Sequence, residues 1–350
     1  MQNRFFVPAA AFMWPHLIIV AFVLIVAAPS QLAAQEFYKG KTMRIVVGFP
    51  AGGGFDTYAR AIGRHMGRHI PGNPTFVVDN MAGAGSMIAA NHVFKAARAD
   101  GLTMGHFQGG LFLQQLIGRA GIEFDAPKFE FVGVPVTDKV ACAMTKASGI
   151  TGMDRWLAAK TPVKMGATAP GTAGYDATRM LEHVLKVPVH LVSGYKGTAD
   201  IRLAAEAGEL AGGCWGWESI RATWAKALES GEAITILQFV PKRLPELQHI
   251  PAAVEFAKTD DAKRLLDAGV HDQGAITRLF ALPPNTPKDR VLLLRKAFVA
   301  TMTDSEFLAD AKKGKLEIDP IGGEEIEKLV TGRLFKLEPT MVSKLKEILK

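Results

Sequence analysis

The stretch from Met43 to Arg60, MRIVVGFPAGGGFDTYAR, constrains the fold more than any other part of this chain. Its apolar, β-branched opening predicts a buried strand, which three successive glycines end. Apolar residues then resume at helical spacing and predict a helix with one apolar face: Phe55, Ala59, Ile62, Met66 and Ile70. The unit is therefore a strand, a glycine turn and a helix start, which is typical of α/β proteins.

A turn of this kind can hold a small anion. Glycine lets backbone N–H groups approach a ligand closely, and a helix start adds free N–H donors and the positive end of a dipole. A carboxylate fits such a position. The alternative is a tight turn that binds nothing, because glycine-rich turns are common. Asp56 stands at the helix start, where capping of backbone N–H groups is favoured over contact with an anion that it would repel.

Composition narrows the function classes. The 350 residues are 48% hydrophobic and 21% charged, enough for two domains with their own cores. The formal charge is +7, but the basic residues are scattered, which favours steering of an anionic ligand over a nucleic-acid arm. The two cysteines, Cys142 and Cys214, could form a disulfide or remain two buried thiols, and the sequence leaves both open.

Residues 1–34 resemble a secretory signal peptide. Arg4 supplies a positive start, Leu17 to Ala28 is an unbroken apolar run, and small residues follow up to an expected cleavage after Ala34. A retained membrane anchor is the alternative, but Pro15 and His16 leave the apolar stretch short for a span. The mature protein is therefore expected to be soluble and periplasmic.

The rest of the chain repeats the order strand, glycine-rich loop and helix, in two sets. The first set includes the loop Asn80 to Ser86, with Ser86 as the expected N-cap of a helix, and Gln108 to Gly110. The second includes the loops Thr168 to Gly174 and Ser193 to Gly197. Apolar and β-branched runs predict further strands at Val189 to Val192, Ala233 to Phe239 and Ala275 to Leu282, and helical patterns are expected at Ile220 to Glu229 and Gly323 to Lys350. Such units predict parallel sheets, and two facing domains predict a ligand cleft between them. We assign residues 36–136 and 272–350 to domain 1 and residues 137–271 to domain 2.

Motifs for catalysis and cofactors are missing from the sequence. Gly83-Ala84-Gly85 lacks the third small residue of a dinucleotide loop, where Ile88 stands, and no P-loop or GxSxG elbow occurs. His65 and His69 have metal-like spacing but no HExxH glutamate. The sequence therefore predicts no cofactor, no metal and no enzyme, although a triad assembled in space stays open.

Several segments, in order, resemble one protein family. YKGKTMRIVVGFPAGGGFDTYAR is similar to its opening strand and PxGGxxDxxAR loop, and VVDNMAGAGSMIAANHVFKAARADGLTMG to its next block. GATAPGTAG, GYKGTADIRLAAEAGEL and FALPPNTPKDRVLLLRKAFVATMTDSEF match its later loops and C-terminal segment more loosely. The family is that of the substrate-binding proteins of tripartite tricarboxylate transporters, the Bug-type receptors. The resemblance implies an α/β, type II periplasmic-binding-protein fold whose two α/β domains close on a ligand cleft.

The resemblance also implies a site and a function. The loop Phe49 to Asp56 would hold one carboxylate, with Ala84 to Ser86 beside it, and loops of domain 2 would close over the ligand. The candidate ligand-binding residues are Phe49, Pro50, Ala51, Gly52, Gly53, Gly54, Asp56, Ala84, Gly85, Ser86, Gln108, Thr168, Pro170, Gly171, Thr172, Tyr195, Lys196, Gly197 and Trp215. A monomeric receptor would capture a small organic acid and deliver it to membrane transporter subunits. The alternatives are a sensor that serves a kinase and, less favoured, a cleft hydrolase.

The domain 2 motifs depart from the family pattern and leave the ligand open. The loop Ala169-Pro170-Gly171-Thr172 replaces GSGT, and Ser193-Gly194 precede Tyr195 where the family has Val-Pro. Lys196 could meet a second carboxylate or be a solvated loop lysine. Trp215 or Trp217 could stack on a flat ligand, although tryptophan at a strand end is more often part of the core.

Overall fold

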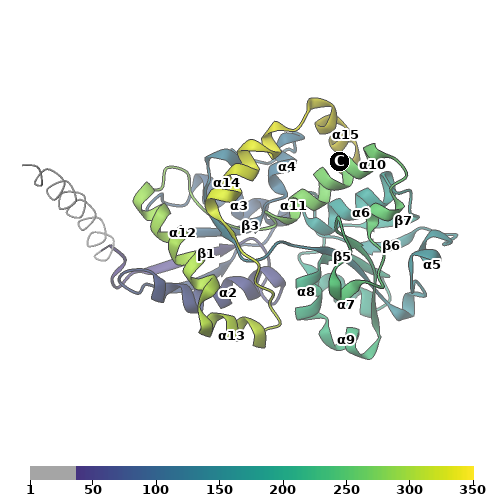
Figure 1. Ribbon diagram of the computed structural model, residues 1–350, viewed down its shortest axis with the longest axis horizontal. Helices are drawn as coiled ribbons and strands as arrows, with labels where there is room; N and C mark the ends of the chain where they lie inside the picture. The colour runs from purple at the N-terminus through teal and green to yellow at the C-terminus, as the bar shows by residue number, and fades with distance from the viewer. Residues whose placement is uncertain (1–36) are drawn as a thin grey trace, which may run out of the picture.

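The computed structural model describes residues 37–350, so the predicted signal peptide lies outside the described residues. Two α/β lobes lie side by side, each built on one sheet (Figure 1). We call the lobe on the six-stranded sheet the first lobe and the lobe on the five-stranded sheet the second lobe. No helix among residues 37–350 is long and apolar enough to cross a membrane. The exact domain limits at residues 136/137 and 271/272 stay a prediction.

The sheet of the first lobe has the order β11-β4-β10-β3-β1-β2. Its strands are β1 (Thr42–Val47), β2 (Thr75–Asn80), β3 (Thr103–Gln108), β4 (Glu130–Val134), β10 (Arg278–Leu282) and β11 (Ile321–Gly322). Its helices are α2 (Gly54–Met66), α3 (Met87–Lys95), α4 (Leu111–Leu116), α12 (Lys288–Thr303), α13 (Ser305–Lys313) and α14 (Gly323–Gly332). The apolar face predicted for α2 is buried, since Ala59, Ile62 and Met66 are fully covered.

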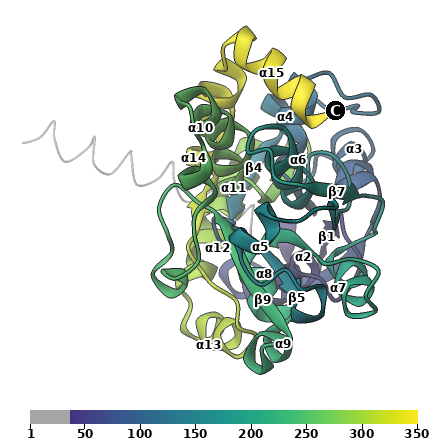
Figure 2. The same cartoon turned by 90° about the vertical axis from the view of Figure 1, so that its right-hand side faces the viewer.

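The sheet of the second lobe has the order β7-β6-β8-β5-β9. Its strands are β5 (Val140–Thr145), β6 (Val163–Gly166), β7 (Val189–Val192), β8 (Gly212–Gly216) and β9 (Ala233–Phe239). Its helices are α5 (Met153–Leu157), α6 (Ala173–His183), α7 (Thr198–Glu206), α8 (Trp217–Thr223), α9 (Ala225–Ser230) and α10 (Asp260–Leu266). The short α11 (Asp272–Gly274) leads back to the first lobe, and the C-terminal α15 (Pro339–Leu349) packs on α6. Both views place α15 at the same end of the molecule as α4 and α6 (Figures 1 and 2).

The prediction of parallel sheets was wrong, because both sheets are mixed. β1 is parallel to β2 and β3, but β10 is antiparallel to β3 and β4. In the second lobe, β6 is parallel to β7 and β8, whereas β5 is antiparallel to β8 and β9. β5 and β10 each follow a crossing from one lobe to the other. Neither is joined to its sheet neighbour by a βαβ crossover, so nothing forces a parallel direction on it.

Three predicted elements have different limits. The helix expected over Ile220 to Glu229 is two helices, α8 and α9, which meet at Trp224. The strand expected from Ala275 begins at Arg278, because Ala275 to Thr277 form a turn after α11. The helix expected over 323–350 breaks into α14, a 3-10 turn and α15, which starts at Pro339, where the fixed proline φ suits the first helical turn.

Cys142 and Cys214 form a disulfide, which answers the question that the sequence left open. The two residues are direct partners in the antiparallel pairing of β5 and β8. Both are buried, at 0% and 1% exposure. The disulfide therefore joins β5, the first strand of the second lobe, to its neighbour β8.

Candidate functional site

A cavity that opens to solvent lies between the two lobes, with about 800 Å³ of empty space including its open mouth. The first lobe contributes the loop after β1 and the end of β3, and the second lobe contributes the loops after β6, β7 and β8. The lining residues of the first lobe, with the crossing segments, are Phe49, Pro50, Ala51, Gly53, Gly54, Phe55, Gln108, Asp138 and Arg278. Those of the second lobe are Ala167, Thr168, Thr172, Ala173, Gly174, Gly197, Thr198, Ala199, Asp200, Ile201, Cys214, Trp215, Gly216 and Ser219.

Three helices begin at the cavity wall. The N-caps of α2, α6 and α7 are Gly53, Thr172 and Gly197, and none of them makes a side-chain capping hydrogen bond. The first-turn N–H groups of a helix have no acceptor within the helix. The cavity therefore presents uncapped N–H donors and the positive ends of three helix dipoles, an arrangement that stabilises an anion.

Asp56 stabilises the loop after β1 from outside the cavity lining. Its carboxylate accepts hydrogen bonds from the backbone N–H of Gly52 and from Arg60 Nε and Asn80 Nδ2, each at 3.0 Å. Burial raises the pKa of Asp56, but these hydrogen bonds outweigh it and hold the pKa below its usual value. Gly52 has a φ of 82°, which a glycine adopts without strain. Asp56 thus shapes the loop and is not among the residues that line the cavity.

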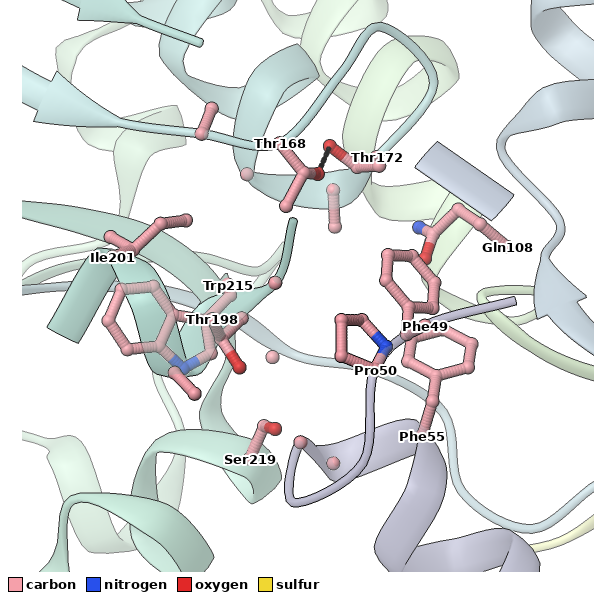
Figure 3. Close-up of a pocket in the computed structure, with 18 of the residues that line it drawn as sticks. Phe49, Pro50, Phe55, Gln108, Thr168, Thr172, Thr198, Ile201, Trp215 and Ser219 are labelled. Atoms are coloured by element: carbon pink, nitrogen blue, oxygen red, sulfur yellow. Dashed lines mark hydrogen bonds between the residues drawn. The ribbon is translucent and has the colours of Figure 1, made fainter. Parts of the chain in front are cut away.

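A similar arrangement supports the loop after β6. The N–H of Gly171, whose φ is 81°, donates to the buried Asp176 at 3.1 Å. Burial raises the pKa of Asp176 to about 7. Thr168 donates to Thr172, whose hydroxyl in turn donates to the carbonyl of Ala169, at 2.9 and 2.7 Å. Figure 3 shows the two threonines together at one side of the cavity. The loop is therefore ordered by its own hydrogen bonds.

Ser86 stands at the predicted N-cap position of α3, but its side chain makes no capping hydrogen bond. Its hydroxyl instead accepts a hydrogen bond from the backbone N–H of Gln108 at 2.9 Å. Gly85 and Ser86 both have a positive φ, of 65° and 72°. The side chain of Gln108 is 2% exposed and lies at the cavity wall (Figure 3).

The cavity brings together some of the predicted site residues and omits others. Those that line it are Phe49, Pro50, Ala51, Gly53, Gly54, Gln108, Thr168, Thr172, Gly197 and Trp215. Those outside the lining are Gly52, Asp56, Ala84, Gly85, Ser86, Pro170, Gly171, Tyr195 and Lys196. Most of the second group support or adjoin the loops. Lys196 is exposed, so the geometry favours its alternative as a solvated lysine.

Trp215 lines the cavity, whereas Trp217 does not. Trp215 is 4% exposed and its ring stacks on Trp224 with 5.6 Å between centroids, so it belongs to the core of the second lobe as well. Its Nε1 has no hydrogen-bond partner among the residues that the structure describes. Trp217 instead donates from Nε1 to Glu246 at 3.2 Å. Of the two tryptophans, only Trp215 could contact a ligand here.

Arg278 and Ser219 also line the cavity and were missed by the sequence analysis. Arg278 starts β10, and its Nε donates to Asp138 at 2.6 Å. Its guanidinium lies 5.1 Å from the ring centre of Phe55 and 4.9 Å from that of Tyr58. The sequence does show a charged residue at the start of an apolar strand, which could have marked Arg278 as a candidate. It does not show which other segments of the chain lie beside that residue.

The two histidines with metal-like spacing each contact an acidic residue in or next to α13. His65 Nε2 is 2.9 Å from Asp310 and His69 Nε2 is 3.0 Å from Asp304. His65 lies in the last turn of α2 and His69 in the 3-10 turn that follows it. Within residues 37–350, no group of three or more histidine, cysteine or acidic residues is arranged to hold a metal.

A scan against models of protein families finds no match, and a search of curated proteins finds none either. Solved structures are similar in fold. R. palustris Rpa4515 with adipate has a TM-score of 0.70 at 22% identity, over 88% of this chain and 98% of that chain. BugD, a periplasmic binding protein, has 0.70 at 20%, over 89% and 98%. MatC of Rhodopseudomonas palustris with malate has 0.68 at 19%, over 89% and 99%. This chain therefore has the two-lobed α/β fold of the periplasmic binding proteins.

Proposed function

We propose that this protein is a solute-binding receptor that captures a small organic acid in the cleft between its lobes. One observation carries the proposal: the uncapped N-termini of α2, α6 and α7 converge on one cavity. Such termini bind carboxylates through backbone N–H groups without a dedicated lysine or arginine. Proteins of the same fold with adipate and malate support the same class of ligand.

The lobe contacts support a cleft that closes over its ligand. A Cβ added at Gly197 would lie 3.4 Å from Pro50 of the opposite lobe, so the two loops approach each other to within the width of a methyl group. On another side, Arg119 donates to the carbonyl of Pro170. An acid bound between these contacts is largely withdrawn from water, which strengthens its interaction with the helix termini.

The receptor acts in the periplasm after removal of residues 1–34 and passes its ligand to membrane transporter subunits of the tripartite tricarboxylate type. The fold and the sequence resemblance support this role. A sensor that serves a signalling kinase is the second candidate. A hydrolase has less support, because Ser219 is in the lining but no histidine is, among the residues that the structure describes.

The test is thermal unfolding of the protein from residue 35 onward against a panel of acids. The panel contains C4 to C6 dicarboxylates, tricarboxylates, amino acids and aromatic acids. An acid at about 100 times its dissociation constant adds about 2.7 kcal/mol to the free energy of unfolding and raises the midpoint by several degrees. Stoichiometric binding with the acid recovered unchanged supports a receptor. Turnover of the acid supports the hydrolase, and no shift with any acid refutes the proposal.

A further inference from the structure

Among residues 37–350, one cationic side chain, Arg278, lines the cavity. Arg278 is 1% exposed and its Nε donates to Asp138 at 2.6 Å, but its Nη1 finds no hydrogen-bond acceptor in the described part of the chain. Buried donors are nearly always satisfied, so an unpaired guanidinium nitrogen at a cavity wall points to a group that is supplied from outside the chain.

Arg278 lies at the end of the cavity next to the lobe crossings. A Cβ on Gly54, the first residue of α2, would lie 3.1 Å from Arg278 Nη1 and 2.1 Å from Ser219 Oγ. Ser219 is 4% exposed, and its hydroxyl makes no hydrogen bond in the described part of the chain. Figure 3 shows Ser219 on the opposite side of the cavity from Thr168 and Thr172. Nη1, the Ser219 hydroxyl and the start of α2 thus share one end of the cavity.

The walls between the two ends are apolar. Trp215 and Ile201 lie on one side, and Phe49 and Phe55 lie on the other (Figure 3). The other end has Gln108 and the start of α6. The cavity therefore fits an elongated molecule with a polar group at each end and an apolar middle.

The charged residues around Arg278 favour an anion at this end of the cavity. Four further charged residues are linked to the Asp138–Arg278 pair: Lys139, Glu218, Arg221 and Glu317. Burial, and then repulsion by Asp138, raise the pKa of Glu218 to about 8, so this carboxyl is neutral at pH 7. Within this cluster, three basic groups then face two ionised carboxylates, Asp138 and Glu317, while the remaining acidic residue of the lining, Asp200, lies in the first turn of α7.

We propose that Arg278 is a specificity-determining ligand contact, whose Nη1 donates to a carboxylate at the crossing end of the cleft while Ser219 donates a second hydrogen bond. Asp138 acts as a positioning residue, because its bond to Nε fixes the plane of the guanidinium. The ligand is then an elongated organic acid with its carboxylate at Arg278 and its apolar part beside Trp215. This inference rests on the proposed function of the cleft as an acid-binding site.

The test compares acids with their neutral amides. Isothermal titration measures the affinities of adipate, adipamide, benzoate and benzamide for the wild type and for variants. Asp138→Asn/Arg278→Gln removes both charges of the buried pair, so no carboxylate is left unpaired. Arg278→Lys keeps the charge but loses the fork geometry. Arg119→Gln is the matched control, because Arg119 bonds across the lobes to Pro170 but does not line the cavity.

The wild type is expected to prefer at least one acid over its amide by roughly 10- to 100-fold, the range for a hydrogen bond to a charged group. The double variant should lose that preference, Arg278→Lys should keep part of it, and Arg119→Gln should keep all of it. A double variant that still prefers the acid as the wild type does would overturn the inference and leave the proposed function standing. If the wild type binds no acid of the thermal panel, both this inference and the proposed function are refuted.

Ser219→Ala covers the case in which the Arg278 variants do not fold. It removes a single hydroxyl and leaves the buried charges in place. Acid affinity should fall roughly 3- to 10-fold, as for loss of one hydrogen bond, and amide affinity should fall less, because a neutral amide carbonyl is a weaker acceptor than a carboxylate. Equal loss for the acid and the amide, or no loss for either, would contradict a carboxylate at this end of the cleft.

Discussion

Replacement of Gly53 by side chains of increasing size tests how closely the two lobes approach each other at the entrance of the cleft. Its φ of −89° and ψ of 173° are open to any residue, so substitution brings no backbone strain. A Cβ there would lie 3.8 Å from Thr198 Oγ1 on the other lobe and 3.8 Å from Pro50 O, which is ordinary van der Waals contact. The two lobes of the Gly53→Ala variant should therefore close normally, whereas the methyl groups of Gly53→Val should not fit between them.

The expected loss of affinity follows from the length of the bond between Cβ and a methyl carbon of valine. The methyl groups of valine extend about 1.5 Å beyond Cβ, so rotamers aimed across the mouth overlap Thr198 or enter the space of the ligand. Overpacking of this kind costs about 1–3 kcal/mol. Because the overlap arises only when the lobes are closed, we expect the dissociation constant to rise roughly 5- to 150-fold with little change in the unliganded melting temperature.

The measurement is isothermal titration of the best acid from the panel into wild type, Gly53→Ala and Gly53→Val, with unfolding of each unliganded protein as the fold control. Gly53→Ala should bind within roughly threefold of wild type, since it adds no overlap. The double variant Gly53→Val/Thr198→Ala should recover part of the affinity. If Gly53→Val binds as Gly53→Ala does, the loop does not approach the ligand and the reasoning fails.

Three further predictions concern stability and the cavity wall. Reduction of the Cys142–Cys214 disulfide, which joins residues 72 apart, should lower the free energy of unfolding by about 2–4 kcal/mol, seen as an earlier urea midpoint with reductant. Glu218 holds its proton up to about pH 8 when folded but only to its ordinary pKa of 4.5 when unfolded, so the free energy of unfolding should fall as pH rises between these values. Glu218→Gln should flatten that slope in melts from pH 5 to 8.5, and an unchanged slope would exclude Glu218 as its source. Trp215→Leu should weaken benzoate by about 2- to 10-fold and leave a short aliphatic acid nearly unchanged, as titration would show.

Much of the local structure could be predicted from the sequence because local rules decide it. β7 and β9 occupy the predicted residues, Val189–Val192 and Ala233–Phe239, since β-branched runs bounded by glycine or turns leave little choice. The loop after β1 was found in the same way, from its glycines and the helical spacing beyond them. These signals lie within about 20 residues of one another in the chain.

Contacts between distant segments could not be predicted. The direction of β10 depends on a return from the second lobe, and the place of Arg278 beside Ser219 and Asp138 depends on both lobe crossings. The disulfide depends on the register of β5 and β8, which no local pattern specifies. The N-cap position of Ser86 could be predicted, but the role of its side chain could not, because its hydroxyl accepts a hydrogen bond from Gln108 on the neighbouring strand.

The position of β10 has a consequence for how the chain acquires its structure. β10 pairs with both β3 and β4, yet it follows them by about 150 residues, whereas all five strands of the second sheet lie between Val140 and Phe239. An N-terminal fragment that ends before Arg278 would lack a central strand and expose the edges of its neighbours. We therefore expect the second lobe, whose sheet strands all lie between residues 140 and 239, to gain protection from hydrogen exchange first during refolding. The first lobe, which carries the opening glycine loop, should become protected only after β10 and the C-terminal helices have joined it.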